Sequence, residues 1–264
     1  MAALAVFIAG CTLVTVLMLG SDDVSAEVYS NEVGFINVDT ADNDFALVSV
    51  PLTLLGDNPH YGLNNVALTG PGEIGQMLAA DLTGSTSFDT ADQIRYFDGA
   101  TYRVAWLYYN PNDANDAYNN LWLEGFAVST LTLEPHQGFW VLRVHAGDPD
   151  TVTFLGGTRT DTPVGVAFET GWSMFSWPYP TDHALQTSTM FADGAHASDS
   201  FDTADRIGAY TPGVGYEWHW LYTDGTWYKQ FTPSTLALKP KQGLWYYRQS
   251  AAGGPFTWSC IKPY

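Results

Sequence analysis

The sequence contains only two cysteines, Cys11 and Cys260. A disulfide framework like that of small secreted domains is therefore excluded, and packing has to stabilise the fold. Because Cys11 lies in an apolar N-terminal run, removal of that run would leave Cys260 alone. The neighbouring Trp258 and Ile261 favour a buried thiol at Cys260, and the alternative is an intermolecular disulfide.

Positive charge is scarce: 10 Lys and Arg stand against 28 Asp and Glu, which gives a formal net charge of −18. Nucleic-acid binding is excluded, because affinity for a polyanion depends on cationic side chains that displace counterions. An anionic membrane surface is disfavoured for the same reason. The partners that we expect are other copies of the protein, other surface proteins or a neutral polysaccharide. Ca²⁺ is the one cofactor considered.

Familiar catalytic motifs are missing as well. The chain has no Gly-x-Ser-x-Gly elbow, phosphate-binding loop or His-Glu-x-x-His zinc site, and its six histidines are scattered. We therefore predict that the protein is not an enzyme, with an acid-dependent hydrolase as the less favoured alternative. Asp-Thr-Ala-Asp tetrads hold many of the acids and are interpreted as turns in which carboxylates bond backbone N–H groups. These acids are Asp39, Asp42, Asp89, Asp92, Asp202 and Asp205.

The N-terminal segment is apolar and uncharged over residues 2–20, and small residues precede Glu27. This pattern is typical of an export signal at residues 1–26 and predicts an extracellular or cell-surface location. Two alternatives stay open. The run is long enough to be retained as a membrane anchor, and Ile8-Ala9-Gly10-Cys11 resembles a lipobox with Cys11 as the acylated residue.

An internal repeat is the strongest pattern in the sequence. Residues 87–92 and 200–205 both read Ser-Phe-Asp-Thr-Ala-Asp, and Trp-Leu-Tyr and Leu-x-Pro-x-Gln-Gly-Phe/Leu-Trp follow each of them in the same order. We infer a duplication, with copy 1 at residues 27–157 and copy 2 at 158–264. The polar, turn-rich residues 156–163 are expected to link the copies.

Each copy is predicted to consist of short strands joined by tight turns, such as Asp98-Gly99 and Asp224-Gly225. The glycine of Leu-x-Pro-x-Gln-Gly is expected to adopt a left-handed conformation. The fold class is all-β, with two tandem antiparallel β-sandwich or small-barrel modules after the signal segment.

Three further segments carry structural expectations. Helix is expected only at residues 75–82 and 188–192. Extra residues of copy 1, within 52–76 and 109–120, belong in loops. Residues 27–38 are expected to form a strand that pairs within its own copy, or alternatively with a neighbouring subunit.

Aromatic residues make up 15% of the chain. Strand alternation puts Tyr216, Trp218 and Trp220 on one face of a single strand. We favour core packing for this stripe, because copy 1 has Val104 where copy 2 has Trp218. The alternative is an exposed surface that contacts sugar rings or another subunit, with Trp227 as a further contact residue.

One loop of copy 1 offers several hard oxygen ligands for Ca²⁺. It lacks the central glycine and distal glutamate of an EF-hand, so a solvated loop is the favoured interpretation. The candidate ligands are Asn110, Asn112, Asp113, Asn115 and Asp116.

With these motifs in view, each copy resembles the tandem aromatic-rich β-modules of exported proteins from environmental bacteria. The shared features are a Ser-x-Pro opening and a Leu-x-Pro-x-x-Gly-Phe/Tyr-Trp closing, and they span most of residues 28–259. His136 and Lys241 stand where such modules often have glycine. The resemblance implies location and architecture, and it carries no site residues.

These observations favour an exported, non-enzymatic structural protein, a self-associating subunit of an extracellular filament, matrix or cell-surface layer. A carbohydrate-binding protein with exposed Trp and Tyr side chains is the alternative.

Overall fold

The structure is a computed structural model that describes residues 33–39, 45–49, 52–53, 61–62, 82–133, 136–144, 151–158 and 162–263. Regular structure in these residues is mostly β-strand, as the sequence predicts. The expected helix at 188–192 is present as one turn, α2 (Met190–Asp193). Residues 75–81 of the other expected helix, the export segment and most of the 52–76 insertion lie outside the described residues. The 3₁₀ turns are η1 (Phe88–Thr90), η2 (Leu185–Thr187) and η3 (Ser250–Ala252).

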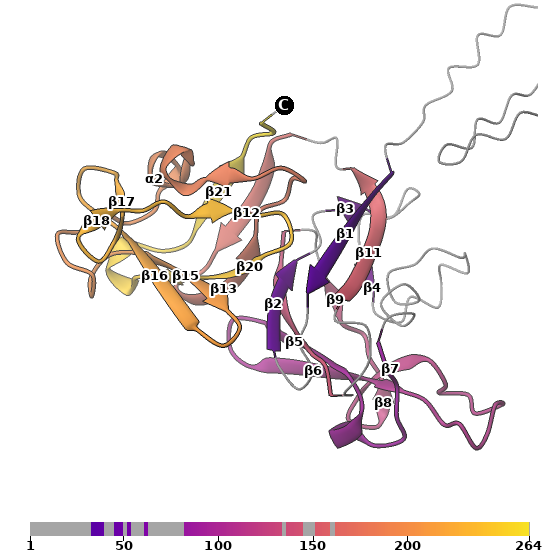
Figure 1. The fold of residues 1–264 in the computed structure, drawn as a ribbon. Helices are drawn as coiled ribbons and strands as arrows, with labels where there is room; N and C mark the ends of the chain where they lie inside the picture. Colours follow the sequence, from indigo (N-terminus) through magenta and orange to yellow (C-terminus); the bar gives the residue numbers. More distant parts are fainter. Residues whose placement is uncertain are drawn as a thin grey trace, which may run out of the picture. The chain divides into compact units, whose positions relative to one another are not determined.

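Two six-stranded antiparallel sheets organise the fold, one in the first half (residues 33–158) and one in the second half (residues 162–263) (Figure 1). The first sheet has the order β2 (Phe45–Ser49), β10 (Gly138–Leu142), β5 (Gln93–Phe97), β6 (Tyr102–Tyr108), β7 (Leu121–Glu124) and β8 (Ala127–Val128). The second has the order β13 (Gly171–Ser176), β20 (Gly243–Arg248), β15 (Arg206–Thr211), β16 (Gly215–Leu221), β17 (Trp227–Lys229) and β18 (Thr232–Pro233). The strand order is the same in both sheets, which agrees with the repeat in the sequence.

The smaller sheets also correspond in pairs, with one additional strand, β3 (Leu52–Thr53), in the first half. The first half has β1 (Val33–Asp39), β11 (Thr151–Thr158) and β3 in one sheet, and β4 (Tyr61–Gly62) with β9 (Thr132–Leu133). The second half has β12 (Val164–Phe168) with β21 (Phe256–Cys260), and β14 (His183–Ala184) with β19 (Ala237–Leu238).

Two expectations about the strands can be compared directly with this topology. β1 pairs antiparallel with β11 of its own half, so the expected pairing within one copy is confirmed. The linker prediction is wrong at its start, because residues 156–158 continue strand β11 and gain its hydrogen bonds.

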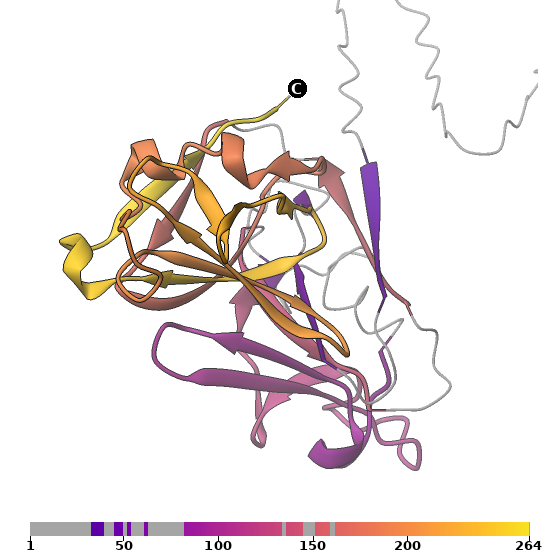
Figure 2. The same cartoon turned by 60° about the vertical axis from the view of Figure 1, so that its left-hand side comes forward.

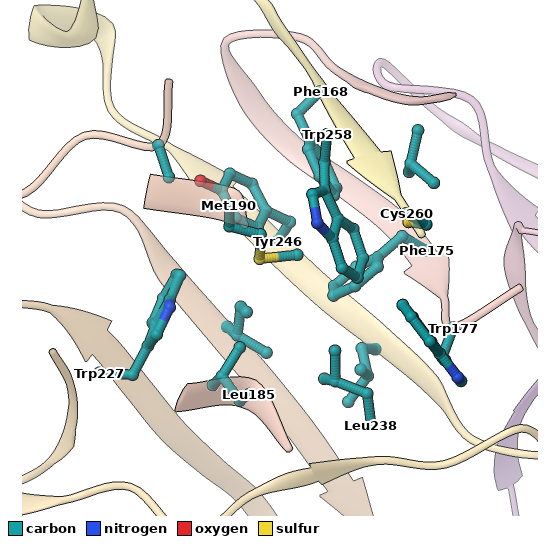
Figure 3. Packing of buried hydrophobic residues seen from close by; sticks show 14 of the residues in the cluster. Phe168, Phe175, Trp177, Leu185, Met190, Trp227, Leu238, Tyr246, Trp258 and Cys260 are labelled. Carbon is teal, nitrogen blue, oxygen red and sulfur yellow. The ribbon is translucent and has the colours of Figure 1, made fainter. Parts of the chain in front are cut away.

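Each half has its own core, formed by one face of its large sheet. In β10 the alternation directs Phe139 and Val141 into the first core, while Trp140 belongs to a separate cluster. In β20 Leu244 and Tyr246 enter the second core in the same way. Figure 3 shows how large aromatic rings fill that second core.

The predicted hairpin turns are confirmed. Asp98-Gly99 joins β5 to β6, with Gly99 at a φ of 99° and the Asp98 carboxylate accepting the N–H groups of Ala100 and Thr101. Asp224-Gly225 joins β16 to β17, with Gly225 at a φ of 84°. Both glycines adopt backbone conformations that residues with a Cβ rarely take.

The glycines of Leu-x-Pro-x-Gln-Gly have a different role from the one predicted. Gly138 and Gly243 are not among the positive-φ residues. They lie where the two halves meet: a Cβ on Gly138 would be 2.8 Å from the Phe175 carbonyl oxygen, and a Cβ on Gly243 would be 2.6 Å from that of Val48. These glycines are needed for close backbone approach.

The contact between the halves is nearly symmetric. Figure 2 shows the two large sheets from a second direction. Ser49 N–H donates to the Lys241 carbonyl at 3.3 Å, and its counterpart Ser176 donates to His136 at 2.8 Å. Around these bonds lies a buried cluster to which both halves contribute equivalent side chains: Leu47 and Trp140 from the first, Met174 and Trp245 from the second. The duplicated units therefore bind each other through the same face.

Candidate functional site

Strand β16 has one buried face and one partly exposed face. His219 and Leu221 are fully buried on the core side. Tyr216 is 44% exposed on the opposite side, Trp218 is half-buried and Trp220 is 8% exposed. The favoured prediction that this stripe is core is therefore confirmed for Trp220 and wrong for Tyr216, while Trp218 packs against a buried cluster outside the second core. Alternation identified the two faces, but the fully buried side chains are the smaller ones, His219 and Leu221.

A groove of about 720 Å³ runs along this aromatic face. Strand β16, the Ser-Phe-Asp turn and the β17–β18 hairpin form its walls. Aromatic and polar side chains alternate around it: Phe201, Tyr216, Trp218, Trp220 and Phe231 with Asp199, Ser200, Thr211, Glu217, Lys229 and Gln230. An open groove with apolar walls and a few fixed polar groups has the character of a ligand site.

Glu217 also lines the groove, although it belongs to the same face of β16 as His219, and two side chains hold its carboxylate. Lys229 Nζ donates to its Oε2, and His219 Nε2 lies 3.0 Å from its Oε1. The hydrogen bond from Lys229 lowers the pKa of Glu217, and the nearby His219 acts in the same direction. Glu217 therefore presents a charged acceptor in a defined position.

Behind Glu217, the imidazole of His219 bonds the Ser234 hydroxyl through Nδ1 at 2.8 Å. Burial lowers the pKa of His219, so the ring is neutral at physiological pH. The Ser–His–Glu sequence of contacts resembles a hydrolase triad, but its accessibility is reversed: Ser234 is buried, whereas the Glu217 side chain is 44% exposed. A substrate could not reach the hydroxyl, so the arrangement supports the position of Glu217.

The first half has the same framework with different chemistry. Its ion pair has the opposite orientation, with Arg103 in place of Glu217 and Glu124 in place of Lys229. Val104 replaces Trp218. The hairpin tip is retained, because the indole N–H groups of Trp106 and Trp220 donate to the equivalent carbonyls of Gly125 and Gln230.

The tetrad acids Asp92 and Asp205 are fully buried. Asp205 accepts hydrogen bonds from Arg248 Nη1 and Tyr246 Oη and from the N–H groups of His196 and Gln249, at 2.7–2.8 Å. Burial, followed by the charge of Asp205, raises the pKa of Tyr246 well above its ordinary value. The turn prediction missed this arginine partner. The signal was an arginine at the same position in each copy, Arg143 directly after β10 and Arg248 at the end of β20.

Asp92 has an equivalent environment in the first half. It accepts the N–H groups of Thr83 and Val144, and Arg143 Nε lies 3.6 Å from it. Both acids are therefore structural.

The Asn/Asp loop uses its oxygens internally. Asn110, Asp113 and Asp116 each accept an N–H group two residues ahead, from Asn112, Asn115 and Tyr118. The Tyr108 hydroxyl also donates to Asp116. In the part of the chain that the structure describes, no three His, Cys, Asp or Glu side chains are grouped for a metal. Ca²⁺ binding here stays a prediction.

Trp227, a predicted contact residue, lies in the second core, and so does Cys260, for which the favoured prediction of a buried thiol is confirmed. Trp227 and Cys260 are each 1% exposed (Figure 3). The Trp227 ring is not accessible to a sugar, and the enclosed Cys260 thiol is not placed for a disulfide with another chain. Both side chains are buried because the alternation along β17 and β21 directs them toward the core.

Neither a family model, nor a curated protein, nor a solved structure matches this chain. The groove therefore has to be interpreted from its own chemistry. Within the described ranges, no helix has the length and apolar character to cross a membrane.

Proposed function

We propose that the chain is an exported, non-enzymatic protein that binds a neutral polysaccharide in the groove of its second half. The observation that carries this proposal is the 44% exposed ring of Tyr216 in a groove that the held residue Glu217 also lines. Sugar rings bury their C–H faces against aromatic rings, and their hydroxyl groups donate to charged acceptors. The groove combines both kinds of contact.

The charge of the chain supports a neutral ligand. With a net charge of −18, the protein repels anionic polymers at long range. The export expected from residues 1–26 would bring the groove to extracellular polysaccharide. In this proposal each half is a β-sandwich-like module, in which the large sheet and the two smaller sheets enclose one core.

Binding to soluble neutral polysaccharides (dextran, laminarin and galactomannan) tests the proposal by titration calorimetry. We expect Tyr216→Ala and Glu217→Gln each to weaken binding at least tenfold, about 1.4 kcal/mol. The matched control is Tyr102→Ala, at the equivalent position of the first half, which should bind like the unaltered protein. Absence of binding to the whole panel, or equal losses in the two tyrosine variants, would contradict the proposal.

A self-associating structural subunit is the second candidate. Phe126 and Phe231 lie at equivalent hairpin tips of the two halves and are 97% and 93% exposed. Large apolar side chains exposed at matching positions favour contact with another protein surface. Sedimentation and negative-stain microscopy of the purified protein should show oligomers that the Phe126→Ser/Phe231→Ser variant lacks. A monomer at every concentration removes this candidate.

A further inference from the structure

A second pocket, of about 400 Å³, lies where the first half meets the second. Its lining residues are Phe45, Arg95, Tyr102, Trp140 and Tyr210. Four of these five side chains are aromatic, and Arg95 supplies the one charge among them. The Arg95 guanidinium lies 4.9 Å from the centroid of the Phe45 ring, and Gln93 Oε1 accepts hydrogen bonds from its Nε and Nη2. The cation is thus held over the Phe45 ring, within the lining of an aromatic pocket.

The duplicated fold shows what occupies the corresponding space in the second half. There the indole of Trp218 stacks on Tyr216, with centroids 5.5 Å apart and planes inclined by 23°, and its centroid is 5.5 Å from that of Trp172. Tyr216 and Trp172 are the counterparts of Tyr102 and Phe45. A flat aromatic ring therefore already occupies one of the two equivalent places.

The two halves differ at one cross-strand pair. Gly208 faces Trp218 in the second sheet, and Arg95 faces Val104 at the same register in the first. A Cβ on Gly208 would lie 2.5 Å from Trp218 Cζ3, so the indole requires glycine beneath it. The first half has exchanged the glycine and the indole for an arginine and a small side chain. Its pocket has lost the internal ring and gained a positive charge.

We infer that this pocket binds a planar aromatic ring that carries a carboxylate. The ring would stack on Tyr102, as Trp218 stacks on its counterpart Tyr216, and Trp140, 8% exposed, would form the floor. The carboxylate would accept hydrogen bonds from the guanidinium of Arg95, whose planar group suits it. The site is distinct from the groove beside Glu217, so the inference does not depend on the proposed function.

Calorimetric titration of the full chain with indole-3-acetate, and in parallel with neutral indole, tests the inference. We expect one site for indole-3-acetate and at least tenfold weaker binding of indole. Two double variants exchange the residue pair of one half for the equivalent pair of the other half. Arg95→Gly/Val104→Trp copies the second half and should lose the site, whereas Gly208→Arg/Trp218→Val copies the first half and should add a second site.

The outcomes separate this pocket from the groove. Arg95→Gly/Val104→Trp should keep any polysaccharide binding, whereas Gly208→Arg/Trp218→Val, which alters a groove residue, should weaken it. Circular dichroism checks folding, and Arg95→Gln provides a milder variant in which the preference for the carboxylate should disappear. The inference is overturned if indole-3-acetate does not bind, if it binds no better than indole, or if the variants with altered Arg95 bind it unchanged.

Discussion

Asp205 illustrates how this strongly acidic chain uses some of its carboxylates. The side chain is fully buried and accepts hydrogen bonds from Arg248, Tyr246 and two backbone N–H groups. Burying a charge is costly unless it is paired and hydrogen-bonded, and here both conditions are met. Asp205 thereby connects the tetrad turn to the end of strand β20.

We predict that Asp205→Asn destabilises the protein by about 3–5 kcal/mol, because it leaves the buried Arg248 without its counter-charge. Urea unfolding followed by tryptophan fluorescence measures the change. Asp202→Asn, in the same tetrad but exposed, is the control and should change stability by less than about 0.5 kcal/mol. Equal stabilities of the two variants would show that the ion pair contributes little.

The sequence predicted the hydrogen bonds that the tetrad aspartates accept from backbone N–H groups, but not their arginine partners. That aspartates in the tetrads bond backbone N–H groups follows from short-range chemistry, and the structure confirms it for Asp92 and Asp205. Arg143 and Arg248 could not be assigned as partners, because only strand pairing brings them next to acids far away in the sequence.

Among the elements, strand β20 begins at a tightly packed position. Its first residue, Gly243, lies against the backbone of β2, and a Cβ there would be 2.6 Å from the Val48 carbonyl oxygen and 2.9 Å from Leu47 Cδ1. Backbone cannot move aside as a flexible side chain can, because its own hydrogen bonds fix it.

Gly243→Ala should therefore destabilise the protein by about 1–3 kcal/mol through overpacking. Thermal and urea unfolding give the size of the effect. Gly165→Ala is the matched control: it is also in a strand, but its nearest neighbour is the methyl group of the exposed Thr257, which can rotate. A Gly243 variant as stable as this control would mean that the halves can separate slightly at no cost.

Strand β16 shows that the alternation of side chains along a strand does not predict which of its two faces is buried. Alternation correctly separates Tyr216, Trp218 and Trp220 from His219 and Leu221, but it does not say which set faces the core. Hydrophobicity favoured the aromatic set, whereas the fully buried residues are His219 and Leu221, and of the three aromatic residues only Trp220 is buried. Burial of His219 is partly compensated, because its Nδ1 bonds the Ser234 hydroxyl and the Glu217 carboxylate lies 3.0 Å from its Nε2.

At the scale of the whole molecule, the two halves meet through equivalent strands. Reciprocal hydrogen bonds from Ser49 and Ser176 and a shared aromatic cluster with Trp140 and Trp245 join them. Edge-to-face contacts cross the boundary in both directions, from Phe97 to Trp245 at 5.4 Å and from Tyr210 to Trp140 at 4.8 Å. Such a contact has the isologous character of a twofold dimer interface.

We expect the halves to remain associated when the chain between them is cut. A protease site inserted between Thr158 and Thr162 allows cleavage of the folded protein, and size-exclusion chromatography then measures whether the fragments elute together. Co-elution is expected because the buried apolar cluster does not depend on the linker. The variant Trp140→Ser/Trp245→Ser, cleaved in the same way, should separate. Separation of the cleaved, otherwise unaltered chain would contradict the prediction.

What the sequence determined by itself was the repeat, the all-β class, the tight turns and the separation of each strand into two faces, because these depend on neighbouring residues and on a period of two. The tertiary structure decided which face became core, why Gly138 and Gly243 are glycines, which arginines neutralise the buried acids, and that one copy has a filled aromatic pocket where the other is open. These features depend on contacts between residues far apart in the chain, and no local pattern specifies which distant side chain will arrive.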